Sequence, residues 1–442
     1  MTHRPQGHPP AQPMPKVVTA SLSGAMLEWY DFNLYGISAA LVFSKLFFPD
    51  IDPVLGTLAS LATFGVGFVS RPLGALVFGH LGDRLGRKQV LVTTMMIIGT
   101  ATFLIGLLPD YHTIGLWAPA LLVLLRLLQG FGLGGEFGGA SLLTVEHAPR
   151  HRRGFWGSLP QTGGPIGYLI AVCAVSLFAG LPEDQFLSWG WRIPFLFSAV
   201  LLVVGLIIRL KIQETPAFQQ VKDTGREERI PLLTALRRYP RNIAVAFGVR
   251  LGEAGSSQIY QPFAISYVTT SLGYGSGVAL TGVVLYNLLG LALIPVAGAI
   301  SDRVGRRPIY LAGALFVALS AFPYFWLLDS GSTALVWTAM ALAVLGGAVC
   351  MSSLQATLFT EMFGVGVRYS GMSFAYQLSA MVAGFVPAIA TSFLVASGGA
   401  SWPVATLAVV LGLVSALATL FLRETRDVDV SEFEARSMEA RA

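Results

Sequence analysis

The stretch GHLGDRLGRKQVLV, residues 79–92, places four charged side chains between two long apolar runs. A near copy, GAISDRVGRRPIYL, occurs at 298–311. Both copies fit one pattern, G-x-x-x-D-R-x-G-R-[KR], which begins at Gly79 in the first copy and at Gly298 in the second. The repeated pattern indicates a chain built from two related halves.

The composition around these motifs indicates a membrane protein. Of the 442 residues, 54% are hydrophobic and 12% are charged, about half the charged share of an ordinary soluble domain. A helix needs about 20 apolar residues to cross a bilayer, and the apolar runs lack the alternation of barrel strands. We therefore predict an all-α integral membrane protein with twelve spans, at 22–46, 57–79, 89–107, 116–145, 155–181, 190–210, 241–271, 278–300, 309–328, 334–360, 368–397 and 401–422.

A second pair of sites supports the duplication. Glu146 and Arg153 match Glu361 and Arg368, at nearly the offset that separates the two motifs. The predicted organisation is a disordered cytoplasmic tail (1–21), a six-helix bundle (22–210), a cytoplasmic linker (211–240), a second six-helix bundle (241–422) and a cytoplasmic tail (423–442).

The basic residues are distributed unevenly between the two sides of the predicted bundle. Of the 29 lysines and arginines, only Lys45 and Arg192 lie in loops opposite the chain ends, while most of the rest lie on the side of the ends. Cytoplasmic loops carry such an excess. We therefore predict that the protein lies in the cytoplasmic (inner) membrane with both chain ends in the cytoplasm. The net charge of +5 then reflects topology rather than nucleic-acid binding.

The repeated motif resembles the cytoplasmic signature of the major facilitator superfamily, and RLLQGFGLGG (126–135) resembles its fourth-helix motif. Five stretches are similar to the metabolite:proton symporters within that superfamily: EWYDFNLYG (28–36), RPLGALVFGHLGDRLGRK (71–88), GGEFGGA (134–140), RGFWGSLPQTGGPIG (153–167) and ETPAF (214–218). The resemblance implies two bundles that rock about a central site and carry α-ketoglutarate, citrate, shikimate, proline or betaine with protons.

The resemblance also implies a cytoplasmic gate. In the family, the aspartate of the first motif bridges to its arginine and to a helix end of the other half, which locks the outward-open state. The residues that would form this gate here are Gly79, Asp83, Arg84, Arg87, Asp302 and Arg306. The alternative is a basic inner loop that only sets topology.

Seven ionisable residues fall inside the predicted spans, away from their ends: Glu28, Asp31, Arg71, Arg126, Glu136, Arg250 and Glu253. Each costs on the order of 2.5–3.5 kcal/mol at a helix centre, so they should face a wet cavity or one another. Asp31, Arg71 and Glu136 all lie about 12 Å from the inner ends of their spans, at 1.5 Å per residue, so we expect them to meet at one level.

These buried charges lead to a hypothesis of proton coupling. Asp31 is the expected proton carrier and Glu136 the alternative, Glu28 shares a helix face with Asp31, and Arg126 or Arg71 would hold or release the proton. Static ion pairs that order the bundle are the competing interpretation.

Buried arginines without buried lysines favour a carboxylate cargo. The expected substrate-binding residues are Arg71, Arg126, Arg250, Tyr30, Gln161, Gln258, Tyr260 and Gln377. A small organic acid is therefore the expected substrate of a monomeric symporter without cofactor or bound metal. A zwitterion symporter, an uncoupled sugar or polyol facilitator and a transport-inactive metabolite sensor remain alternatives. An enzyme is not expected, since His147 and His151, the closely spaced histidines, belong to a basic loop.

Overall fold

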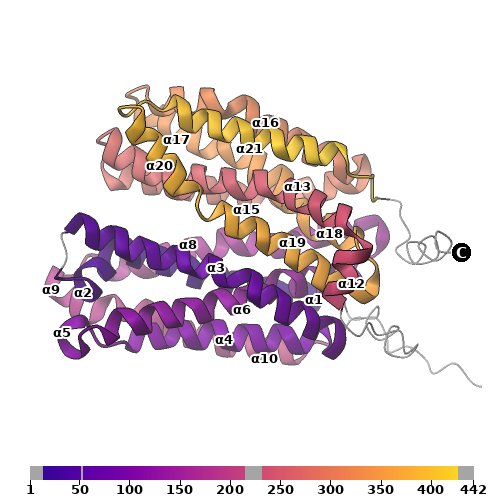
Figure 1. The fold of residues 1–442 in the computed structure, drawn as a ribbon, viewed down its shortest axis with the longest axis horizontal. Coiled ribbons are helices and arrows are strands. Elements are labelled where there is room, and N and C mark those ends of the chain that lie inside the picture. The colour runs from indigo at the N-terminus through magenta and orange to yellow at the C-terminus, as the bar shows by residue number, and fades with distance from the viewer. Residues whose placement is uncertain (1–12, 51–52, 215–230, 427–442) are drawn as a thin grey trace, which may run out of the picture.

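The computed structural model describes residues 13–50, 53–214 and 231–426. Within them the chain is helical throughout, and Figure 1 shows two layers of long helices, one from each half of the chain, lying side by side. Ten helical segments of the described chain are long and apolar enough to cross a bilayer. The other two predicted spans, the first of each half, are also continuous helical segments, but they carry buried charges.

The first half contains the long helices α1 (Met14–Ser38), α3 (Pro53–Leu85), α4 (Arg87–Leu107), α6 (Trp117–His147), α8 (Gly163–Ala179) and α10 (Arg192–Leu210). Shorter elements are the π-helical turn η1 (Ala39–Phe43), α2 (Ser44–Phe47), α5 (Tyr111–Ile114), the turn η2 (Arg150–Arg152), α7 (Arg153–Ser158), η3 (Leu159–Thr162), α9 (Glu183–Gln185) and η4 (Phe186–Gly190).

The second half opens with α12 (Pro231–Arg238) and α13 (Pro240–Gln258), followed by η5 (Ile259–Phe263), α14 (Ala264–Ser266) and η6 (Tyr267–Ser271). Then come α15 (Ser276–Val304), α16 (Arg306–Leu328), α17 (Thr333–Leu342), η7 (Ala343–Leu345), η8 (Gly346–Ser352), α18 (Ser353–Glu361), η9 (Val365–Val367), α19 (Arg368–Ala383), α20 (Val386–Ala396) and α21 (Trp402–Leu420). In the predicted seventh span, the chain leaves regular α-helical geometry after Gln258, where the π-helical η5 contains Pro262.

A glycine turns the chain inside each copy of the motif. Gly86 separates α3 from α4 with φ of 112°, and Gly305 separates α15 from α16 with φ of 108°. An L-residue with a side chain is strained in this region, so glycine is required for so tight a connection. Across the halves, α3 packs against α19, and α15 packs against α7 and α8.

The first helix begins earlier than predicted. Residues 14–21 belong to α1, so the prediction of a disordered tail up to residue 21 is wrong for this segment. Val17 and Ala20 are buried and pack with Leu91 and Leu143, and this apolar burial holds the segment in the helix. The rest of the predicted tail, 1–12, lies outside the described residues, as do 215–230 of the predicted linker and 427–442 of the second tail.

Candidate functional site

The first copy of the motif makes a contact between the halves. Asp83, near the end of α3, accepts hydrogen bonds from Tyr369 N (3.2 Å), Ser370 N (2.9 Å) and Ser370 Oγ (2.7 Å) at the start of α19. The N-terminal end of a helix presents free N–H groups and positive partial charge, so it is a good partner for a carboxylate. Arg87 Nη2 lies 3.6 Å from Asp83 Oδ1 and neutralises the buried charge.

The second copy repeats the arrangement with the halves exchanged. Asp302 accepts hydrogen bonds from Gly154 N (2.8 Å) and Phe155 N (2.9 Å) at the start of α7. Arg306 Nη1 lies 3.0 Å from Asp302 Oδ1. The two motifs thus clamp the same end of the bundle, and each aspartate holds the first turn of a helix from the opposite half.

Two glutamates form further ion pairs at the end of the bundle where the two motifs lie, and this role was not predicted for them. Glu146 accepts a hydrogen bond from Arg368 of the other half at 2.9 Å and lies 3.9 Å from Arg87. Its counterpart Glu361 lies 3.8 Å from Arg306 and accepts a hydrogen bond of 2.5 Å from Thr425. The repeated spacing of these residues was visible in the sequence, but the partners depend on how the halves dock.

Gly79 and Arg84, also predicted for this gate, differ in their surroundings. A Cβ added to Gly79 would lie 2.9 Å from Ser370 Cα, so glycine permits the close approach of α3 to α19. Arg84 is exposed, and no ion pair joins it to another described residue. The structure therefore places Gly79 in the contact between the halves and Arg84 outside it.

Asp31 lies deep in the first half without a direct partner. It is 2% exposed, and neither carboxyl oxygen has a hydrogen-bond partner of normal geometry among the described residues. Thr102 and Arg126 are its polar neighbours. Gln129 connects these two, since its Nε2 donates to Thr102 Oγ1 (2.7 Å) and its Oε1 accepts from Arg126 (3.1 Å).

Arg126 is held mainly by aromatic rings. Its guanidinium carbon lies 4.2 Å from the ring centroid of Tyr35 and 4.8 Å from that of Phe64, and Nε has no hydrogen-bond partner in the described chain. Cation–π contacts stabilise a buried arginine but leave its donors available to an anion. Arg71 is similar, 4.5 Å from the Phe68 centroid with an unpaired Nε.

Glu136 takes part in a different cluster. It forms a buried salt bridge with Arg209, which lies one residue before the end of the predicted sixth span (190–210). It also accepts a hydrogen bond from Thr94 at 3.0 Å. Arg209 also donates to Leu91 O at 2.6 Å. The structure therefore does not assemble Asp31, Arg71 and Glu136 into one cluster, and Glu136 matches the alternative of a static ion pair. The end-of-span position of Arg209 concealed this partner.

The other buried pair lies in the second half. Arg250 forms a salt bridge with Glu253, three residues on, and donates to Tyr376 Oη at 3.1 Å, with its guanidinium carbon 4.3 Å from the ring centroid of that tyrosine. Glu253 also accepts from Gln355 at 3.1 Å. The ring of Tyr376 stacks on Phe137 of the first half, with centroids 3.5 Å apart.

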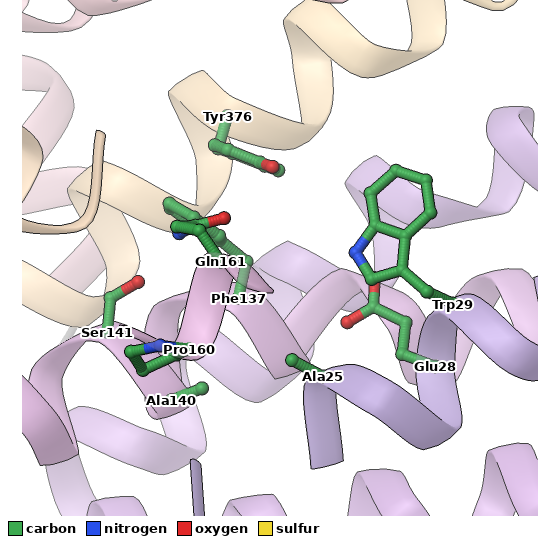
Figure 2. Close-up of a pocket in the computed structure, with 9 residues that line it drawn as sticks. All are labelled: Ala25, Glu28, Trp29, Phe137, Ala140, Ser141, Pro160, Gln161 and Tyr376. Atoms are coloured by element: carbon green, nitrogen blue, oxygen red, sulfur yellow. The ribbon is translucent and has the colours of Figure 1, made fainter. Parts of the chain in front are cut away.

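A small cavity of about 30 Å³ lies beside this stack. Figure 2 shows Glu28 and Trp29 on one side of it, and Gln161, Phe137 and Tyr376 on the other. Arg71 interacts electrostatically with both Glu28 and Tyr376. The volume accommodates no more than a few water molecules, so the halves are closed around the site in this conformation.

The remaining predicted binding residues fall into two groups. Tyr30 donates to Pro194 O at 2.6 Å within the first half, and Gln377 donates to Leu133 O at 2.9 Å across the halves. Both therefore have structural partners. Tyr260 is buried against Tyr324, with a hydroxyl that makes no hydrogen bond of normal geometry in the described chain, and Gln258 is half-buried at the end of α13.

Comparison with known proteins agrees with this architecture. The family model "Major Facilitator Superfamily" matches residues 19–388. The chain is 44% identical to the "Shikimate transporter" of Escherichia coli, over 87% of this chain and 89% of that protein, and 36% identical to its "Proline/betaine transporter", over 88% and 79%. It is 38% identical to the "Inner membrane metabolite transport protein YhjE", over 89% and 91%.

Solved structures agree on the fold. The proton:xylose symporter XylE bound to 6-bromo-6-deoxy-D-glucose superposes with a TM-score of 0.75 at 17% identity, over 96% of this chain and 98% of that one. The prediction of two six-helix bundles in the major facilitator fold is confirmed, as is the prediction that the protein is not an enzyme. The described helices, the duplicated motif and the family match together show that this chain is a membrane transporter of the Major Facilitator Superfamily.

Proposed function

We propose that this protein is a proton-coupled symporter that imports a small organic acid across the cytoplasmic membrane. The observation that carries the proposal is Asp31, a buried carboxyl group that forms no ion pair with a described residue and whose two oxygens have no hydrogen-bond partner of normal geometry in the described chain. A lone buried carboxylate is costly, and binding a proton removes that cost. Asp31 is therefore the proposed proton carrier, ahead of Glu136.

Arginine provides the link from the proton to the substrate. Arg126 interacts electrostatically with Asp31 and is joined by Gln129 to Thr102 beside it, and it retains an unpaired Nε, as Arg71 does. A substrate carboxylate that draws either guanidinium toward itself weakens the positive field at Asp31, so the proton and the anion bind together. The relative named for shikimate supports a carboxylate cargo.

The substrate would lie at the cavity between the halves. Glu28, Gln161 and Tyr376 line it. Arg71 interacts electrostatically with Tyr376, and Arg250 donates a hydrogen bond to the Tyr376 hydroxyl. Here the motif end is closed and the cavity is too small for cargo, which corresponds to a state in which the inner gate is shut. Loading would require the two halves to separate at the opposite end.

A zwitterion is the second candidate for the substrate, and the aromatic and acidic residues that line the cavity favour it. Trp29, Phe137 and Tyr376 line the cavity together with the acid Glu28. Aromatic faces with a nearby carboxylate suit a quaternary ammonium group, and the "Proline/betaine transporter" is 36% identical. Arg71 or Arg250 would then bind the carboxylate end of the same molecule.

The test is uptake into liposomes that contain the purified protein. With an inward proton gradient, labelled shikimate and other small carboxylates are expected to accumulate, and the uncoupler should abolish accumulation. Uptake of betaine or proline instead of other carboxylates would support the second candidate. Uptake of a sugar or polyol that resists the uncoupler would indicate a facilitator. Binding without uptake would indicate a sensor.

The coupling role is tested by Asp31→Asn. This variant should lose proton-driven accumulation and retain exchange of labelled for unlabelled substrate, because exchange needs no net proton movement. Asp184→Asn is the matched control, because Asp184 is an exposed acid in the short helix α9, away from Asp31. Full accumulation by Asp31→Asn would remove Asp31 from the mechanism.

The proposed arrangement in the cell places both chain ends in the cytoplasm and the transporter as a monomer with no cofactor. The basic residues on the motif side support this orientation. Labelling of single cysteines from either side of sealed vesicles tests it, and accessible labels at residues 79–92 from the outside alone would reverse it.

A further inference from the structure

We propose that α12 is an in-plane surface helix that binds anionic lipid headgroups at the gate end of the transporter. Its sequence, PLLTALRR, covers Pro231–Arg238, directly before α13. Pro231 and Ala235 are buried on one side of the helix, whereas Leu233 and Leu236 are exposed on the other, each 38% exposed. Two leucines and a basic C-terminal turn are the pattern of a helix that lies on a membrane surface.

The packing of α12 sets its place at the edge of the gate. Its buried side contacts α3 of the first half and contacts α19, η9 and α13 of the second. These are the elements that Asp83 joins, since it lies on α3 and accepts hydrogen bonds from the first turn of α19. In Figure 1, α12 lies at that same end of the molecule, where the two layers meet.

The charge on the exposed side fits an anionic partner. Arg237 on α12 and Arg241 at the start of α13 are exposed, and no ion pair joins either of them to a described residue. Arginine side chains can extend to phosphate groups while their stems cover apolar surface. Each basic residue near an anionic membrane surface strengthens binding roughly fivefold, so the pair should contribute roughly 25-fold.

Position and composition together identify the occupant as lipid. The gate lies at the ends of the membrane-crossing helices α3 and α19, and α12 contacts both of them, so we place α12 at the level of the headgroups. Leucine side chains inserted there and arginines on phosphate together satisfy the exposed side of α12. Because α12 contacts both halves, lipid binding would also act on the gate.

The experiment uses the full-length chain with both cysteines replaced, as Cys173→Ala and Cys350→Ala. A polarity-sensitive fluorophore is attached at Leu236→Cys, and the protein is placed in vesicles of phosphatidylcholine alone or with added phosphatidylglycerol. The same fluorophore at His151→Cys is the control, on an exposed residue of η2 in the other half. Function of the labelled variants is checked by substrate uptake.

With phosphatidylglycerol present, the fluorophore at position 236 should shift to the blue and be quenched by headgroup-level spin-labelled lipid, while the one at position 151 should not. Replacement of both arginines, R237Q with R241Q, should weaken the binding of phosphatidylglycerol roughly 25-fold, so that the shift is lost at the lipid composition that saturates the parent, and R237K with R241K should leave the shift nearly unchanged. The Lys pair separates lost charge from lost packing.

Two results would overturn the proposal. A fluorophore that remains in water in both kinds of vesicle would show that α12 does not bind lipid. A fluorophore shielded to the same extent in vesicles with and without phosphatidylglycerol would show that anionic headgroups do not cover Leu236. Neither result depends on the identity of the transported substrate.

Discussion

Asp83→Asn should open the gate at the motif end of the transporter. The carboxylate of Asp83 accepts three hydrogen bonds from the first turn of α19, one of them from Tyr369 N and two from Ser370. Asp83 is 3% exposed in this closed arrangement. When the halves separate, Asp83 faces water, so its replacement affects mainly the closed state.

The size of the effect follows from the hydrogen bonds. Asparagine has one acceptor oxygen where aspartate has two, so at least one of the N–H groups of α19 loses its partner and the others lose the charge. Hydrogen bonds to charged groups contribute about 1.5–3 kcal/mol and neutral ones about 0.5–1.5 kcal/mol. The closed state should lose about 2–4 kcal/mol, which shifts the closed-to-open ratio roughly 30- to 700-fold.

The assay is a distance measurement across the gate by spin-label spectroscopy. Leu85 and Val304 are suitable label sites, because they are exposed, end α3 and α15, and occupy equivalent positions in the two motifs. Labels there should give a single short distance in the parent protein. In Asp83→Asn, a longer distance should become the main population in detergent.

Two comparisons make the result specific. Asp302→Asn should lengthen the same distance, because Asp302 holds the first turn of α7 in the equivalent way. Arg84→Gln should not, because Arg84 belongs to the same motif but is exposed and has no ion pair with a described residue. An unchanged distance in Asp83→Asn, or an equal change in Arg84→Gln, would refute the assignment of the gate to these hydrogen bonds.

Three further predictions concern stability and packing. Glu136→Gln should lower the midpoint of thermal unfolding in detergent, since removal of one partner of a buried ion pair costs about 3–5 kcal/mol, and combining it with Arg209→Met should recover part of the loss; additive effects would contradict the pairing. Gly79→Ala should lengthen the Leu85–Val304 distance, because a Cβ would lie 2.9 Å from Ser370 Cα, and an unchanged distance would mean that this approach is not tight. Glu424→Gln should destabilise the protein by about 0.5–2 kcal/mol, since Glu424 accepts from Arg306 N (2.9 Å) and Arg307 N (3.1 Å) at the start of α16, and an unchanged unfolding midpoint would contradict it.

The gate was largely accessible from the sequence because the repeated motif resembles the cytoplasmic signature of the major facilitator superfamily. Asp83, Arg87, Asp302 and Arg306 were identified from the motif, and the structure places all four between the halves or beside that contact. The contact of Glu146 with Arg368 was not predicted, although both residues belong to the second pair of matching sites found in the sequence. A sequence repeat shows which residues are equivalent in the two halves, but it carries no information on which residues contact each other across the halves.

The buried charges were identified correctly as buried, but their partners were not. Helical depth places Asp31, Arg71 and Glu136 at one level, yet depth is one coordinate and leaves the direction around each helix axis undetermined. Glu136 therefore pairs with Arg209, which lies at the end of its own helix. Tyr376 was also missed, because a lone tyrosine in an apolar span carries no sign that it stacks between the halves.

The amino-acid sequence by itself determined that the chain crosses a membrane as helices, that it is duplicated and where each half turns, because these depend on local composition, spacing and glycine. Tertiary structure alone decided which buried charge is neutralised in an ion pair and which, like Asp31, forms no ion pair with a described residue. It also decided that α12 joins both halves with two leucines exposed. The reason is physical: the cost of burying a charge belongs to each residue, but the partner that offsets the cost is chosen by the rotation and docking of whole helices.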